Sequence, residues 1–173
     1  MGVNVAQLLL RSARLYPALP ALALGEAVTS SYAQLAARVA ALAGGLCAHW
    51  GLAPGERVAL VMRNCTQYVE VLFACWHAGL VAVPINAKLH PQELAYILAD
   101  SGARACFVTG EHHANVASLQ AALPALAAVV DVGSAEYEGL ARAAPVGIAE
   151  RAAQDIAWLF YTSGTTGRPK GCL

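Results

Sequence analysis

The residues best suited to chemistry stand near the end of the chain, after a run of apolar and aromatic residues. From Tyr161 to Gly171 the sequence reads YTSGTTGRPKG, with three glycines, four serine or threonine hydroxyls and two cations. Glycines allow backbone N–H groups to converge on one anion, and hydroxyls add neutral donors at short reach. Lys170 supplies a mobile positive charge for phosphate oxygens. The segment therefore predicts a phosphate-binding loop at the end of a strand.

The spacing within this segment separates it from the Walker A loop. A Walker A loop has four residues between its glycines and a Ser or Thr directly after its lysine. Here two residues separate Gly164 from Gly167, and Gly171 follows Lys170. Pro169 also disfavours a helix beginning at the residue before it. A P-loop NTPase is therefore excluded. A plain turn without a ligand is the alternative, but a turn does not need this lysine together with these hydroxyls.

Strand-like and helix-like runs alternate ahead of this segment and predict a layered fold. We expect a hairpin at 21–24 and 27–30, helices at 32–49, 66–78, 91–100 and 115–122, strands at 57–62, 80–85, 105–108, 127–132 and 157–161, and an irregular connector at 133–154. Runs such as 57–62 are apolar throughout, as is typical of parallel strands buried on both faces. The alternation predicts an α/β fold with a mostly parallel sheet flanked by helices.

Local signals place the ends of several elements. Ser31 with Gln34 predicts a capping box at the start of the helix at 32–49, and Asn64 is a candidate cap for the helix at 66–78. The first 17 residues predict an amphipathic helix with Val5, Leu8, Leu9 and Ser12 along one face, and they lack the layout of a signal peptide.

Charge and hydropathy exclude two classes of function. Acidic and basic residues are equal in number, which argues against a nucleic-acid footprint. The 58% hydrophobic and 13% charged composition is more apolar than an ordinary domain, in which roughly a quarter of the residues are charged. The charge-free stretch between Glu70 and Lys88 is interrupted and falls short of the roughly 20 apolar residues of a spanning helix. We therefore expect exposed apolar surface that favours self-association.

Cysteine and histidine patterns suggest no metal site. The five cysteines are an odd number without a C-x-x-C pair, which favours reduced thiols in a cytoplasmic protein. His112 and His113 are adjacent and face different directions on a helix, so a solvated helix start is favoured over a metal site. Asp131 and Asp155 are interpreted as turn or cap residues.

The run YTSGTTGRPKG resembles the phosphate-binding signature of the adenylate-forming superfamily, which includes acyl-CoA synthetases, adenylation domains of peptide synthetases and beetle luciferases. The resemblance extends over the segments 31–35, 51–59, 78–86 and 93–103. Glu56 stands where the family often has Asp. The resemblance implies the fold of the N-terminal subdomain of these enzymes, with residues 1–173 as one truncated subdomain that ends at the loop 161–171.

The resemblance also implies a reaction. A carboxylate attacks the α-phosphorus of Mg²⁺·ATP and releases pyrophosphate, and the thiol of coenzyme A then takes the acyl group. The residues implied to hold the β- and γ-phosphates are Thr162, Ser163, Gly164, Thr165, Thr166, Gly167 and Lys170. The resemblance places no catalytic residue and no metal ligand within this chain.

Several expectations follow from where the resemblance stops. The acyl pocket, the adenine-binding loops and the catalytic lysine of the family have no counterpart here, so we expect this chain alone to be inactive in adenylation. Cys172 and Leu173 are too few for the strand after the loop, so residues 163–170 are expected to be mobile or held by a neighbouring chain. An adenylation domain that loads a carrier protein and a non-catalytic nucleotide-binding remnant stay open as alternatives. The identity of the acid is not determined.

Overall fold

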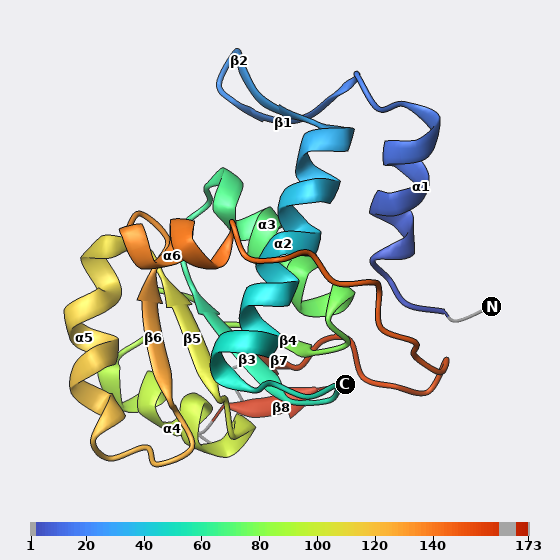
Figure 1. The fold of residues 1–173 in the computed structure, drawn as a ribbon. Coiled ribbons are helices and arrows are strands. Elements are labelled where there is room, and N and C mark those ends of the chain that lie inside the picture. Colours follow the sequence, from blue (N-terminus) through green and yellow to red (C-terminus); the bar gives the residue numbers. More distant parts are fainter. Residues whose placement is uncertain (1–2, 163–168, 173) are drawn as a thin grey trace.

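A parallel sheet of four strands forms the centre of the computed structural model, which describes residues 3–162 and 169–172 (Figure 1). The strands are β3 (Arg57–Val61), β4 (Val81–Pro84), β5 (Ala105–Val108) and β6 (Ala128–Asp131), in the order β4-β3-β5-β6. The helices α3 (Thr66–His77), α4 (Pro91–Ser101) and α5 (Gly110–Gln120) connect them. The predicted mostly parallel α/β fold is confirmed.

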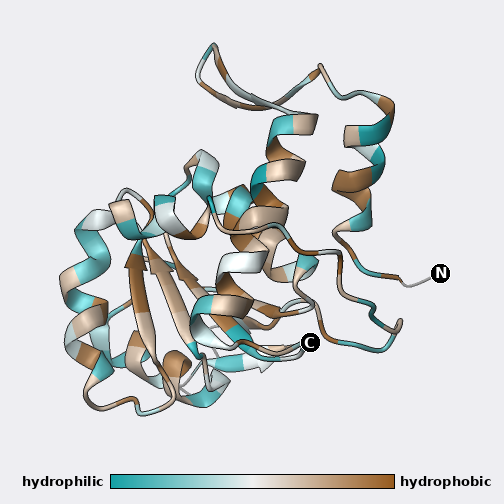
Figure 2. Ribbon diagram, viewed as in Figure 1, coloured by the Kyte–Doolittle hydropathy of each residue, from teal (hydrophilic) through white to brown (hydrophobic). Residues whose placement is uncertain are grey.

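Helices cover both faces of this sheet, and side chains of each strand alternate between two apolar clusters. Val58 and Leu60 of β3 pack with side chains of α2 (Tyr32–Trp50), α3 and α6 (Ala135–Leu140). Ala59 and Val61 point to the opposite face and pack with side chains of α4 and α5. The strands are coloured as hydrophobic between more mixed helices in Figure 2. Burial on both faces explains why the strands are apolar throughout.

An N-terminal lobe stands on top of this layered core. It contains α1 (Gln7–Leu15) and the antiparallel hairpin of β1 (Pro20–Leu24) and β2 (Ala27–Ser31). The capping box of Ser31 and Gln34 at the start of α2 is confirmed. The predicted face of the first helix is wrong at Leu8, which is 64% exposed, whereas Leu9 is buried. The buried face of α1 is centred on Leu9, and Leu8, which lies about 100° away around the helix, falls outside it.

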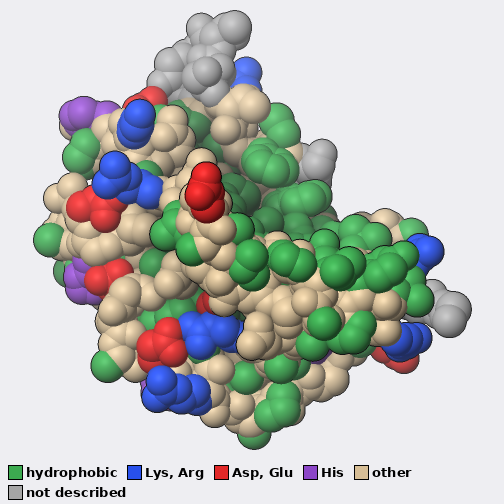
Figure 3. Space-filling view, turned by 90° about the horizontal axis from the view of Figure 1, so that it is seen from above, with side chains coloured by type: hydrophobic (Ala, Val, Ile, Leu, Met, Phe, Trp, Pro, Cys, Tyr) green, Lys and Arg blue, Asp and Glu red, His purple; other side chains and the backbone are tan. Residues whose placement is uncertain are grey.

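Large apolar side chains remain exposed on this lobe. They are Val3, Leu8, Leu15, Tyr16, Leu19, Leu24 and Val28, each more than half exposed. Green side chains gather across this part of the molecule in the view from above (Figure 3). Exposed apolar surface was expected from the composition, and the structure places most of it on the lobe rather than on the sheet.

The connector after β6 contains a helix that the sequence did not predict. We expected an irregular segment at 133–154, but α6 forms with Ser134 as its N-cap and with Tyr137 fully buried. The Tyr137 hydroxyl donates to Glu70 Oε2 of α3 (2.6 Å), and Arg38 of α2 donates to Glu70 (2.7 Å) and to Glu138 (2.6 Å). These bonds between distant segments hold α6 on α2 and α3.

Two other boundaries differ from the expectation. The helix expected at 115–122 is α5, which begins at Gly110, so Glu111 and His112 lie in its first turn. Asn64 does not cap α3, because Cys65 occupies the N-cap position with no side-chain hydrogen bond. Within the described residues, no helix has the length and apolar character needed to cross a membrane.

Candidate functional site

The two ends of the YTSGTTGRPKG segment pair with each other as a short antiparallel hairpin. Its strands are β7 (Phe160–Thr162) and β8 (Lys170–Cys172), and Thr162 lies directly opposite Lys170. The expectation that too little chain remained for a second strand is wrong, because three residues suffice to pair with β7. Of the implied phosphate-binding residues, the structure describes Thr162 and Lys170. Ser163, Gly164, Thr165, Thr166 and Gly167 lie outside the described residues.

Thr162 and Lys170 are both exposed, so their polar groups are free of the apolar core. A hydroxyl and an ammonium on facing positions of one hairpin can donate to oxygens of the same phosphate group. The thiol of Cys172 lies beside them, with Sγ 3.9 Å from the Thr162 hydroxyl. The two described members of the implied set are therefore brought together at the base of the loop.

The strand that leads into the hairpin is tied to the edge of the sheet. Ala82 of β4 exchanges two backbone hydrogen bonds with this strand, from its own N–H to Ala157 (3.1 Å) and from Leu159 to its carbonyl (3.0 Å). Trp158 forms a parallel bridge with Ala82. The predicted strand at 157–161 is therefore only partly confirmed, because Trp158 forms an isolated bridge at the edge of β4 and the strand itself, β7, begins at Phe160. The bridge and the two backbone bonds fix where the hairpin begins.

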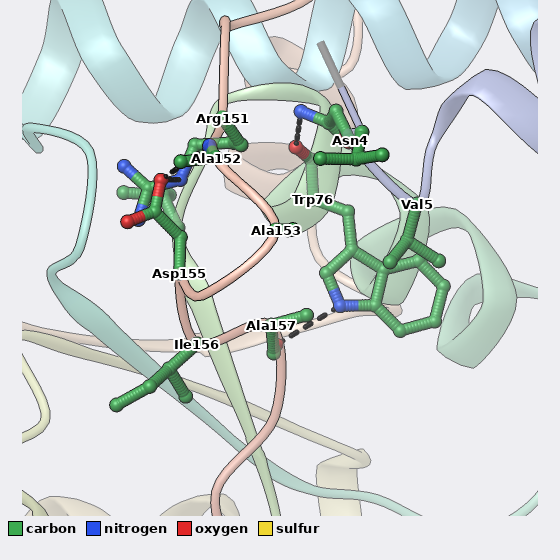
Figure 4. Close-up of a pocket in the computed structure, with 12 residues that line it drawn as sticks. Asn4, Val5, Trp76, Arg151, Ala152, Ala153, Asp155, Ile156 and Ala157 are labelled. Atoms are coloured by element: carbon green, nitrogen blue, oxygen red, sulfur yellow. Dashed lines mark hydrogen bonds and ion pairs between the residues drawn. The ribbon is translucent and has the colours of Figure 1, made fainter.

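A side chain of α3 bonds to the same carbonyl of this strand. Trp76 Nε1 donates to the Ala157 carbonyl (3.0 Å), and Asn4 Nδ2 donates to the Trp76 carbonyl (2.7 Å) (Figure 4). A pocket of about 340 Å³ lies beside these groups, and Arg151 and Asp155 on its rim pair with each other (3.1 Å). The polar side chains that line this pocket all have partners within the protein. We therefore interpret them as a support for the strand rather than as a ligand site.

Tyr161 joins β7 to α4. Its hydroxyl donates to Asp100 Oδ2 at 2.6 Å. Burial and the hydrogen bond to Asp100 raise the pKa of Tyr161 above its ordinary value, so the hydroxyl stays a donor throughout the neutral range. Sequence reasoning included Tyr161 in the motif but assigned it no role. The partner lies 61 residues earlier on a helix, and no local pattern connects the two.

A wide pocket of about 830 Å³ opens at the carboxyl ends of β3 and β4, next to Phe160 of the hairpin. Its polar lining residues are Arg63, Asn64, Tyr68, Asn86, Lys88, Glu111 and His112. Carboxyl ends of parallel strands are where open α/β sheets bind ligands. Arg63 and Glu111 pair across it at 3.2 Å. Lys88 and Arg63 could not be identified as pocket residues from the sequence, because isolated cations form no pattern.

The candidate metal ligands of the described residues do not gather into one cluster. No group of three or more His, Cys, Asp or Glu residues in these ranges could hold a metal ion. Glu111 bonds to Arg63, and Asp131 accepts from the Gly133 N–H (2.9 Å), in agreement with its predicted turn role. The magnesium implied by the resemblance would be held by the phosphates of ATP, and the described residues contain no cluster of protein ligands for it.

Comparisons with known proteins agree with this fold and identify the family of the chain. The family described as AMP-binding enzyme matches residues 9–173. A feruloyl-CoA synthase of Amycolatopsis sp is 46% identical over 151 residues, which cover 86% of this chain and 28% of that protein. The fatty acid--[acyl-carrier-protein] ligase ScoC of Streptomyces coeruleorubidus is 36% identical, over 91% of this chain and 30% of its own length.

A solved structure extends the likeness to three dimensions. The inhibitor-bound N-terminal domain of FACL13 from Mycobacterium tuberculosis superposes with a TM-score of 0.87 and 31% identity, over 99% of this chain and 44% of that one. The chain thus spans less than a third of the length of the two sequence relatives. Its fold is that of the N-terminal domain of adenylate-forming enzymes, and the chain belongs to the AMP-binding enzyme family.

Proposed function

We propose that this chain supplies the phosphate-binding segment of a ligase that activates a carboxylic acid with ATP and passes the acyl group to coenzyme A. The observation that carries the proposal is the placement of Thr162 opposite Lys170 at the base of the YTSGTTGRPKG loop. The family of the chain and its similarity to CoA and carrier-protein ligases support it. The protein is proposed to work in the cytoplasm, since all five cysteines are free thiols.

The proposed reaction has two steps. In the first, a carboxylate oxygen bonds to the α-phosphorus of ATP, and the bond from that phosphorus to the β-phosphate oxygen breaks. Pyrophosphate leaves with the bonding electrons, and an acyl adenylate remains. In the second step, the sulfur of coenzyme A attacks the acyl carbon, and AMP leaves. The thiol proton passes to a base.

The role of this chain lies in the first step. Negative charge builds on the β- and γ-phosphates as pyrophosphate departs, and donors already in place stabilise this charge. Lys170 contributes a full positive charge, and the Thr162 hydroxyl contributes a neutral donor from the facing strand. Magnesium bound to ATP would neutralise part of the same charge. Ser163, Gly164, Thr165, Thr166 and Gly167 are proposed to complete the set of donors.

The acceptor could also be a carrier protein rather than coenzyme A. The similarity to ScoC, over 91% of this chain, is the observation that favours this second function. Both reactions share the adenylation step, so the proposed role of Lys170 is the same in each. Ferulate is the first acid to test, because the feruloyl-CoA synthase has the higher identity of the two relatives.

Binding measurements on the 173-residue chain test the proposed phosphate site. Calorimetry with Mg²⁺·pyrophosphate should show binding to the wild type and about tenfold weaker binding to Lys170→Ala, which corresponds to ~1.4 kcal/mol. Arg14→Ala removes an exposed cation of α1 far along the chain and serves as the control. Equal losses for both variants, or no binding by the wild type, would contradict a specific phosphate site.

Turnover measurements test the rest of the reaction. We expect the 173-residue chain alone to release no pyrophosphate from ATP with any acid, because it spans less than a third of the length of its relatives. The gene sequence beyond codon 173 decides whether a longer protein exists. In such a protein, exchange of pyrophosphate into ATP with ferulate, benzoate or a fatty acid would identify the acid. Adding coenzyme A or a carrier protein would then identify the acceptor.

A further inference from the structure

Tyr161 is the last residue of the incoming strand with a hydrogen bond from its side chain to the body of the molecule. Three bonds hold the strand before it, through Trp76 and Ala82. Beyond Leu159 no further backbone hydrogen bond joins the described part of this strand to β4, and Phe160 is 47% exposed. At Tyr161 the contact passes to the other face of the sheet, where the hydroxyl reaches Asp100 near the end of α4.

The ring of Tyr161 also touches the returning strand. Gly171 lies opposite Tyr161 in the hairpin, and a Cβ added to Gly171 would lie 3.4 Å from Cζ of the ring and 3.2 Å from Cδ1 of Leu159. The ring of Tyr161 in β7 therefore lies over Gly171 of β8, and its hydroxyl is bonded to Asp100. Pro169, which precedes Lys170, is buried.

A small crevice of about 260 Å³ separates this part of the hairpin from α4. Ile97 and Glu93 line it on the side of α4, and Tyr161, Thr162 and Pro169 line it on the side of the hairpin. Apolar packing between the two parts is therefore incomplete, and the hydrogen bond from Tyr161 to Asp100 bridges them where the packing is thin.

We propose that the bond between Tyr161 and Asp100 is a positioning contact that sets the angle of the β7–β8 hairpin, so that Thr162 and Lys170 meet one phosphate group together. The contact acts through the hairpin and touches no ligand. The inference rests on the proposed phosphate site, because the contact has a functional consequence only if this hairpin binds phosphate. Without this bond, the hydrogen bonds through Trp76 and Ala82 hold the strand only as far as Leu159, and the hairpin beyond it would be free to pivot.

Removing either partner should have the same effect on binding. Tyr161→Phe and Asp100→Ala are each expected to weaken binding of Mg²⁺·pyrophosphate about three- to tenfold, and the double variant is expected to be no weaker than either single one. Asp100→Asn keeps an acceptor oxygen and should restore most of the affinity. Tyr96→Phe removes a hydroxyl from the preceding turn of α4 and should stay within about twofold of the wild type. All affinities are compared at a temperature at which each variant is fully folded.

Hydrogen exchange without ligand provides the second measurement. Amides of β7 and β8 should exchange about tenfold faster in Tyr161→Phe, while amides of β3 and β5 keep their wild-type rates. Unchanged exchange in the hairpin overturns the inference, whatever the affinities show. Unchanged affinity in Tyr161→Phe, beside a measurable loss for Lys170→Ala, also overturns it and leaves the phosphate site standing. If the wild type binds no pyrophosphate, the proposed function fails. Faster exchange in Tyr161→Phe would then support only the role of the Tyr161–Asp100 bond in holding the hairpin.

Discussion

The central sheet and the β7–β8 hairpin are both made of short strands, yet their surroundings are opposite. Every residue of β5 and four of the five in β3 are buried, whereas β7 and β8 contain no buried residue in their described positions. Burial of apolar area is the main source of folding free energy, so the sheet with its helices holds the fold together. The hairpin carries the groups proposed for the ligand. Changes in one region should therefore leave the other largely intact.

Gly44 offers the strongest way to break the fold while leaving the hairpin residues in place. It lies in α2, and a Cβ added there would come 2.0 Å from the Ala144 carbonyl oxygen. Because that atom belongs to the backbone, the segment after α6 would have to move away from α2. We expect Gly44→Ala to lower the free energy of unfolding by about 3 kcal/mol, measured by urea denaturation.

Gly139 provides the matched control for that change. It also lies in a helix, α6, but a Cβ added there would meet nothing within 4 Å. Gly139→Ala should leave the free energy of unfolding unchanged or raise it by about 0.5 to 1 kcal/mol, since alanine restricts the unfolded chain. Equal losses in both variants would mean that α2 does not approach the segment after α6 as closely as the structure has it.

Substitution of Tyr137 should give the next largest loss of stability, again through the packed core. Its buried hydroxyl donates to the Glu70 carboxylate, so Tyr137→Phe should lower the free energy of unfolding by about 2 kcal/mol at pH 7. Glu70 keeps its bond to Arg38, which limits the loss. Binding of Mg²⁺·pyrophosphate at a temperature at which the variant is folded should not change, because α6 and the hairpin are separate.

Tyr137 should also make the free energy of unfolding depend on pH in the alkaline range. Burial and the nearby Glu70 carboxylate raise the pKa of Tyr137, so the folded chain holds the phenolic proton more tightly than the unfolded chain. This contribution is complete below the unfolded pKa of about 10 and is lost as the pH rises above it. Stability of the wild type should therefore fall above pH 10, and Tyr137→Phe should show a shallower fall. Parallel curves would contradict the buried donor.

Apolar patterning was enough to predict the core from sequence. The strands at 57–61 and 105–108 lie within two of the predicted runs, since strands buried on both faces must be apolar at every position. Apolar patterning did not predict α6. That helix has six residues, and its stability depends on contacts of Tyr137 with Glu70 and of Glu138 with Arg38, which lie 67 and 100 residues apart. Contacts at such separation leave no periodic signal in the sequence.

The site shows the same division between local and distant information. A contiguous motif identified Thr162 and Lys170, because glycines, hydroxyls and a cation in one short run are informative without any structure. The support of that motif comes from Trp76, Ala82 and Asp100, which lie on three separate elements. Nothing in the spacing of these residues indicates that they meet. Ser163, Gly164, Thr165, Thr166 and Gly167 remain predictions from the motif.

Cysteine labelling compares the exposure of the central sheet with that of the hairpin in the wild-type chain, because both regions contain cysteines and no mutation is needed. Burial raises the pKa of the Cys75 and Cys106 thiols to about 12, while Cys172 is exposed on β8. The thiolate is the reactive form, so iodoacetamide at pH 8 should modify Cys172 within minutes and the two buried thiols only as fast as the chain opens. Mass spectrometry of the peptides at successive times gives the rates.

Because Cys172 Sγ lies 3.9 Å from the Thr162 hydroxyl, Mg²⁺·pyrophosphate should slow the labelling of Cys172 and leave that of Cys75 and Cys106 unaffected. Labelling of Cys106 as fast as that of Cys172 would show that the sheet is no more closed than the hairpin.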